Sequence, residues 1–146
     1  MGQEEMDLSR TVGYLLKQVQ AALRSEMDAV LGPLSLSAPQ YACLELLKRN
    51  PAISNSALAR GAFVSRQSMN SVLHTLRERG LVEPAASGAQ GRAVPMQLTA
   101  TGQDLLLKAG SAVKEIEERM ISDLTDSQHA MLVDALHSCA RSLGRR

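Results

Sequence analysis

Aromatic residues are almost absent from this chain of 146 residues. They make up 2% of the sequence, as Tyr14, Tyr41 and Phe63, and there is no tryptophan. Proteins that hold single-stranded nucleic acid stack its bases on aromatic rings, so this composition argues against a surface of that kind. Because hydrophobic residues still reach 45%, we expect an aliphatic core large enough for one compact domain.

Cysteine and long apolar runs are also scarce. Cys43 and Cys139 are too few for a disulfide framework. No apolar run approaches the roughly 18 residues that would span a membrane, and the acidic start of the chain lacks the apolar segment of a signal peptide. We therefore expect a cytoplasmic protein without a membrane partner.

Catalytic and metal-binding patterns are missing too. The sequence has no glycine-rich phosphate loop, no Cys-x-x-Cys pair and no Gly-x-Ser-x-Gly element. His129 and His137 each follow an aspartate by three residues, but such pairs on a helix surface are usually solvated. We expect neither an enzyme nor a cofactor or metal site.

Apolar residues recur at helical spacing near both ends of the chain, which predicts a mainly α fold. A long helix is expected from Leu8 to Leu31, and Gly32-Pro33 ends it. Ser37 is placed to cap a shorter helix that stops at Asn50-Pro51.

Two further long helices are expected after residue 99. Thr101 is the predicted cap of the first, and Thr125-Asp126 starts the last. Together with the first helix they carry more apolar surface than a small central module could cover. A homodimer would bury this excess.

Residues 53–99 have a different organisation, with two short helices close together. Ser54 is expected to cap the first, Gly61 lets the chain turn, and Ser65 caps a second helix that Gly80 closes. The glycine- and proline-rich stretch that follows predicts a β-hairpin, with Leu81–Glu83 pairing with about Val94–Leu98.

The second of these helices has two chemically distinct sides. One side is apolar and holds Met69, Val72, Leu73 and Leu76. The other holds Arg66, Gln67, Asn70, Ser71 and His74. Arginine can bind guanine with two hydrogen bonds, and asparagine or glutamine can bind adenine in the same way. The polar side therefore suits base edges in a major groove, although a solvated face of a helix bundle would show a similar pattern.

Charge is unevenly distributed behind a net charge of +1. Residues 60–92 carry a net charge of +3, whereas residues 1–31 carry −2 and residues 104–134 carry −4. Contact with a polyanion is therefore expected in the middle of the chain.

The segment LARGAFVSRQSMNSVLHTLRERGLVEP, followed by Arg92 and LTATG, resembles the winged helix-turn-helix of MarR-type transcriptional regulators. The upstream LSAPQYACLELL resembles the short helix that precedes it there. The resemblance covers about residues 8–143. It implies a mainly α fold with a two-stranded antiparallel wing and long terminal dimerisation helices. The regions implied are residues 1–36, 37–99 and 100–146, within one compact domain.

The function implied is that of a dimeric, sequence-specific DNA-binding regulator. It would be a repressor of a pseudo-palindromic operator, released by a small phenolic or anionic effector. The helix 65–79 would lie in the major groove and the wing 83–97 would reach the minor groove. The DNA-binding residues expected are Ser54, Asn55, Ser65, Arg66, Gln67, Ser68, Asn70, Ser71, His74 and Arg92. The effector-binding residues expected are Tyr14, Met27, Tyr41 and Cys43.

The sequence departs from the family at three positions of the reading region. Gln90 stands where the family usually has an acidic residue that holds the wing arginine, here Arg92. Ser71 and Pro84 stand where the family often has basic residues. Fewer contacts to DNA follow from these replacements.

Two alternatives remain open at this point. One is a partner-binding helical protein whose helix-turn-helix does not read DNA. The other is a regulator that senses oxidants through a cysteine. The peroxide-sensing members place that cysteine in the first helix, and here no cysteine precedes Cys43.

Overall fold

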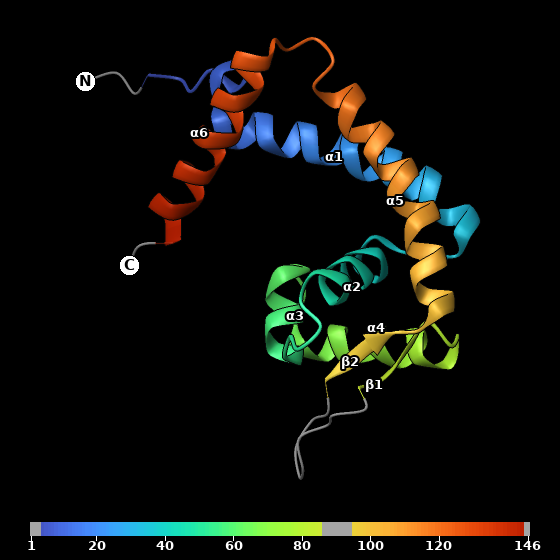
Figure 1. Ribbon diagram of the computed structural model, residues 1–146. Helices are drawn as coiled ribbons and strands as arrows, with labels where there is room; N and C mark the ends of the chain where they lie inside the picture. The colour runs from blue at the N-terminus through green and yellow to red at the C-terminus, as the bar shows by residue number, and fades with distance from the viewer. Residues whose placement is uncertain (1–3, 86–94, 145–146) are drawn as a thin grey trace. The chain divides into compact units, whose positions relative to one another are not determined.

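The computed structural model describes residues 4–85 and 95–144, and Figure 1 shows its helices and strands. The elements are η1 Leu8–Arg10, α1 Val12–Leu31, η2 Gly32–Leu34, α2 Ala38–Arg49, α3 Asn55–Gly61, α4 Arg66–Glu78, β1 Val82–Pro84, β2 Met96–Leu98, α5 Ala100–Met120 and α6 Asp126–Gly144. The chain forms two compact units, Met1–Val113 and Lys114–Arg146. The mainly α fold with two antiparallel strands is confirmed.

The first unit is built around a core of aliphatic side chains. Leu44 and Leu47 of α2, Leu58 of α3, and Met69 and Leu76 of α4 are almost completely buried. Burying a side chain of this kind stabilises the fold by about 1.5–3 kcal/mol. Because α2, α3 and α4 all contribute to this core, it holds α4 by one side and leaves its other side outside.

Three serines cap the helices of the first unit, as predicted from the sequence. Ser37 accepts a hydrogen bond from the Gln40 N–H (3.2 Å), and the Gln40 side chain accepts one from the Ser37 N–H, which completes a capping box. Ser54 and Ser65 cap α3 and α4 in the same manner. Gly80 ends α4 with a positive φ of 72°.

The prediction that Gly61 makes the turn between α3 and α4 is wrong. Gly61 is the last residue of α3, and the turn uses Phe63, which takes a left-handed φ of 58°. Gly61 serves a close approach instead, because a Cβ on it would lie 2.9 Å from Cδ1 of Leu46 on α2. A phenylalanine thus takes the left-handed conformation that glycine usually adopts, and it is 94% exposed.

The predicted cap of α5, Thr101, is also wrong, because Thr101 lies inside the helix. Thr99 has this role: its Oγ1 accepts a hydrogen bond from the Gly102 N–H (3.0 Å) and donates one to the Gly80 carbonyl (2.6 Å). The start of α5 is thereby tied to the end of α4, and a Cβ on Gly102 would overlap the carbonyl oxygen of Leu81.

The wing begins as expected. β1 and β2 pair antiparallel with Val82 opposite Leu98 and Pro84 opposite Met96. Val82 and Met96 are buried, which fixes the base of the hairpin on the core. Val94 and the tip of the wing lie outside the described residues.

Apolar side chains remain exposed along α1 and α6. On α1 these are Val12, Leu15, Leu16 and Val19. On α6, which begins at the predicted Thr125 cap, they are Met131, Leu132, Val133, Leu136 and Leu143. Across residues 4–85 and 95–144, no helix combines the length and apolar character needed to cross a membrane.

Candidate nucleic-acid interface

Helix α4 presents a continuous polar surface opposite the core. Met69 and Leu76 are fully buried and Leu73 nearly so. Arg66, Gln67, Asn70, Ser71 and His74 are all exposed, and we call their side chains the reading face. The division follows from the helical repeat, which places residues three, four and seven apart on one side.

The serines near the start of α4 are engaged within the helix. Ser65 Oγ accepts a hydrogen bond from the Ser68 N–H (3.1 Å) and donates one to Ser68 Oγ (3.0 Å). Ser71 Oγ donates to the Gln67 carbonyl (3.3 Å). These bonds hold the first two turns of α4 in shape.

An open groove of about 410 Å³ runs between α4 and the wing. Its apolar residues are Leu73 of α4 and Pro84 and Met96 of the two strands. Its polar residues are Asn55, Asn70, His74 and Arg77. The structure therefore brings two predicted residues of the reading face together with Asn55 from the start of α3.

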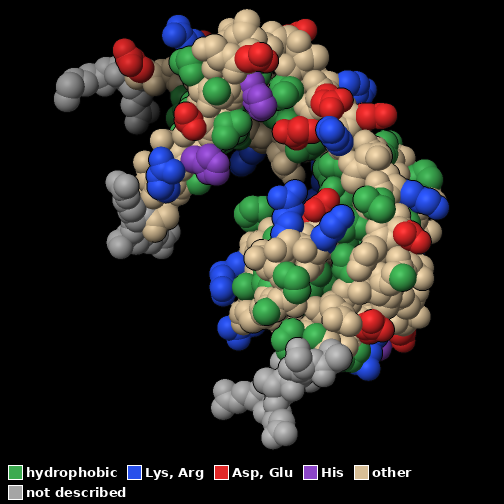
Figure 2. All heavy atoms as spheres, in the orientation of Figure 1, with side chains coloured by type: hydrophobic (Ala, Val, Ile, Leu, Met, Phe, Trp, Pro, Cys, Tyr) green, Lys and Arg blue, Asp and Glu red, His purple; other side chains and the backbone are tan. Residues whose placement is uncertain are grey.

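Arg77 is not among the DNA-binding residues expected from the sequence, but its place in the groove makes it a functional candidate. It lies seven residues after Asn70 and three after His74, so helical spacing already placed it beside them. Its exposed guanidinium adds a positive charge to the groove. Figure 2 shows basic side chains on the same unit, around the edge of the part that carries α2 and α3.

The wing arginine, Arg92, lies outside the described residues. At the base of the wing, Gln97 Nε2 donates a hydrogen bond to Glu83 Oε1 (3.2 Å) across the strand pair. Pro84, which stands where the family often has a basic residue, lines the groove with its apolar ring.

The four expected effector residues do not converge on one place. Tyr14 is half-exposed near the start of α1, and Met27 lies thirteen residues later, about 20 Å along the helix axis. Met27 and Tyr41 are half-buried and pack against the core of the first unit. Cys43 is completely buried, so it lines no opening in this state.

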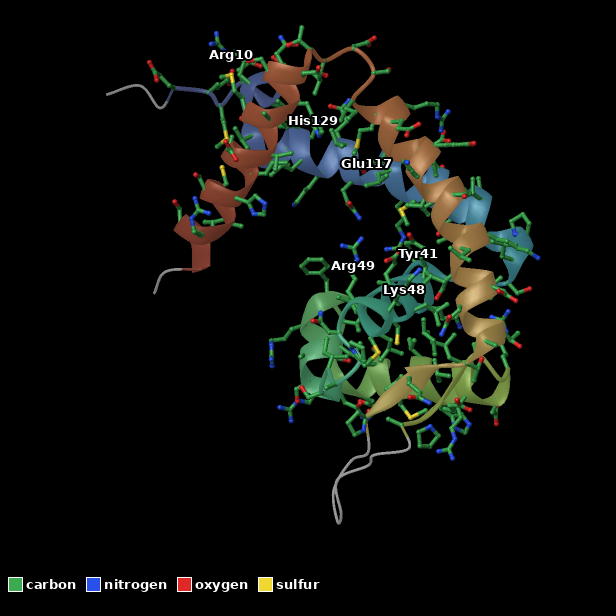
Figure 3. The ribbon with its side chains drawn as sticks, in the orientation of Figure 1. Arg10, Tyr41, Lys48, Arg49, Glu117 and His129 are labelled. Atoms are coloured by element: carbon green, nitrogen blue, oxygen red, sulfur yellow. The ribbon has the colours of Figure 1, made fainter. Side chains whose placement is uncertain are left out.

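Tyr41 belongs to a row of polar side chains on α2. Its hydroxyl donates to Glu45 Oε1 (3.0 Å), and Arg49 Nε donates to Glu45 Oε2 (3.3 Å). Burial, followed by the hydrogen bond to Glu45, raises the pKa of Tyr41 above its ordinary value. Figure 3 shows Tyr41, Lys48 and Arg49 following one another along α2.

Burial also decides the chemistry of Cys43. Loss of solvent around the thiol raises its pKa to about 12, so the reactive thiolate is scarce at neutral pH. This argues against Cys43 as an oxidant sensor. Cys139 is exposed on α6.

Residues 34–93 match the model of the MarR family. The HTH-type transcriptional repressor Rv2887 of Mycobacterium tuberculosis is 42% identical over 117 residues, which make up 80% of this chain and 84% of the relative. The chain belongs to the MarR family. This MarR protein is similar to Rv2887 in structure as well.

Two crystal structures of Rv2887 show the extent of that similarity. The complex with salicylic acid matches with a TM-score of 0.73 at 39% identity, over 88% of this chain and 96% of that one. The complex with DNA matches with a TM-score of 0.71 at 36% identity, over 88% and 97%. The family resemblance seen in the sequence is confirmed, and with it the winged helix-turn-helix.

Proposed function

We propose that this MarR protein is a homodimeric transcriptional repressor that reads a pseudo-palindromic operator with α4 and releases it when a small aromatic acid binds. The division of α4 into a buried apolar side and an exposed reading face carries the proposal. The fold needs only the apolar side of α4, and the other side has the chemistry of base-edge recognition. The proposed function is the binding of DNA rather than catalysis. Because the proposed target is operator DNA, we expect the protein to act in the cytoplasm.

The residues have separate parts in the proposal. Arg66, Gln67 and Asn70 contact base edges in the major groove. Ser54, Asn55, Ser65, Ser68, Ser71 and His74 surround these contacts, where hydroxyl and N–H groups suit phosphates. Arg92 reaches the minor groove, whose negative potential attracts arginine.

The exposed apolar residues of α1 and α6 support a dimer. Each of these two helices exposes several large apolar side chains, and exposed apolar surface on a small protein is characteristic of an interface. A two-fold dimer presents two copies of α4, which then read half-sites roughly 34 Å apart, one turn of duplex DNA.

Selection of duplexes from a random pool tests the reading face. We expect the wild-type dimer to enrich a pseudo-palindrome, and Arg66→Ala and Asn70→Ala each to weaken binding about 5- to 150-fold. Ser111→Ala, an exposed change on α5, is the matched control and leaves binding unchanged. No enriched sequence for the wild-type protein, or equal affinities for all four proteins, would contradict the proposal.

The effector part of the proposal is supported by the relative, whose crystal structures contain salicylic acid and p-aminosalicylic acid. We assign the half-buried Met27 and Tyr41 to the effector site of this chain. Salicylate titrated into the protein–DNA complex is expected to release the duplex. Tyr41→Phe and Met27→Ala are expected to raise the concentration required, whereas Tyr14→Phe is not. Release at the same concentration in all variants would remove these two residues from the site.

A further inference from the structure

We propose that Arg79 is a positioning residue that fixes the angle between α4 and α1, and thereby sets the half-site spacing that the dimer accepts. The inference rests on the proposed function, because spacing has a meaning only for a dimer on DNA. Arg79 is the C-cap of α4. Its guanidinium donates from Nη1 to the Ser35 carbonyl (2.6 Å) and from Nη2 to the Leu34 carbonyl (3.3 Å).

These two carbonyls belong to the junction between α1 and α2. η2 follows α1 directly, and Ser35 then takes a left-handed conformation with φ 55° and ψ 37°. The Ser35 N–H donates to the Gly32 carbonyl (2.8 Å) and the Leu36 N–H donates to the Leu31 carbonyl (3.1 Å). The carbonyls of Leu34 and Ser35 point out of this turn, and one guanidinium receives both.

Helix α1 is attached to the core of the first unit near its C-terminal end. Leu31 is completely buried, and Met27 and Val30 are half-buried against the core. Residues 12–22 are exposed along their whole length. Since α1 has 20 residues and therefore extends about 30 Å, a small rotation at the junction becomes a large displacement at its far end.

Arg79 connects this junction to α4 itself. The exposed apolar residues of α1 belong to the proposed dimer contact, and α4 carries the reading face. An angle fixed between the two helices fixes the distance between the two copies of α4. Arginine suits the task because its planar fork serves two acceptors at once, whereas the single ammonium group of lysine keeps the charge without that geometry.

The variant Arg79→Lys therefore separates positioning from a phosphate contact. The operator selected with the wild-type protein is compared with two versions that have one base pair inserted or removed between the half-sites. We expect the preference of Arg79→Lys for native spacing over the altered spacings to fall about 2- to 30-fold relative to wild type. Arg79→Ala is expected to show the same loss of preference. The midpoints of thermal unfolding of both variants are expected to lie well above the assay temperature.

Arg77→Ala is the matched control on the same turn of α4. Because Arg77 lines the groove, its loss is expected to weaken binding to all three duplexes equally and to reduce the salt dependence by about one ion. An unchanged spacing preference in Arg79→Lys would overturn the inference, as would a uniform loss with reduced salt dependence in Arg79→Ala. If the wild-type protein selects no duplex, the proposed function itself is contradicted. That result is distinct from the two results that would overturn the role of Arg79.

Discussion

His74 and Glu78 face each other on α4, with His74 Nε2 3.1 Å from Glu78 Oε1. Both side chains are largely exposed, and His74 also lines the groove beside the wing. A carboxylate therefore stands one helical turn from a predicted DNA contact. Near a duplex this negative charge opposes the phosphates.

Removing that charge is expected to tighten DNA binding. Glu78→Gln keeps the size and hydrogen-bonding capacity of the side chain while abolishing repulsion of the phosphates. We expect affinity for the operator and for unrelated duplexes to rise about two- to fivefold, as for other exposed charge pairs. Fluorescence anisotropy at two salt concentrations measures the affinities for both kinds of duplex. Glu115→Gln on α5 is the control, and an equal gain there would point to net charge alone.

The left-handed Phe63 is expected to cost stability. A side chain with a Cβ pays about 1 kcal/mol or more in this conformation, and a ring that is 94% exposed returns little packing. Phe63→Gly should therefore raise the free energy of unfolding by about 1 kcal/mol. Phe63→Ala retains the Cβ and should not raise the free energy of unfolding. Urea titration distinguishes the two, and equal stabilities of both variants would show that the backbone is unstrained.

Gly102 is expected to tolerate no side chain. Because a Cβ there overlaps the Leu81 carbonyl, Gly102→Ala should push the start of α5 away from the end of α4 and destabilise the fold by about 3 kcal/mol or more. Gly110→Ala, inside α5, would bring a Cβ to 3.8 Å from Glu45 Oε1 and should instead be neutral or stabilise by up to about 1 kcal/mol. Thermal unfolding of the two variants provides the comparison; similar midpoints would show that α5 can shift without cost.

Cys43 should make stability fall at high pH. Burial raises the thiol pKa from 9.0 to about 12, so above pH 9 the unfolded chain loses a proton that the folded chain keeps. The contribution of the protonated Cys43 thiol to the free energy of unfolding is complete below pH 9. It is lost between pH 9 and about 12, with a slope of about 1.4 kcal/mol per pH unit for one proton. The free energy of unfolding measured with urea should differ less between pH 8 and pH 10 in Cys43→Ala than in the wild-type protein. The same difference in both proteins would assign it to other groups.

The local signals in the sequence identified most of the fold. Ser37, Ser54 and Ser65 cap their helices because a cap depends on an N–H three residues away, and a short sequence window contains both partners. The two sides of α4 were likewise readable from helical spacing. These features position the reading face, so the candidate site followed from the sequence together with the fold.

Features that depend on distant neighbours were not predictable. The sequence predicts a turn at Gly61, but the need for glycine there comes from Leu46 on another helix. Thr99 rather than Thr101 caps α5 because Thr99 also reaches the Gly80 carbonyl. The contact of Arg79 with Ser35 joins residues 44 positions apart, for which no periodicity in the sequence gives a signal.

The exposure of residues 12–22 of α1 has a consequence for how the protein behaves on dilution. A helical segment of this length is marginal in water without tertiary support. When the two subunits of the proposed dimer separate, the N-terminal half of α1 is expected to lose the cover of the partner and to fray, while the rest of the first unit stays folded. Far-ultraviolet circular dichroism should therefore lose helical signal as the protein concentration falls, so α1 couples helix content to subunit association.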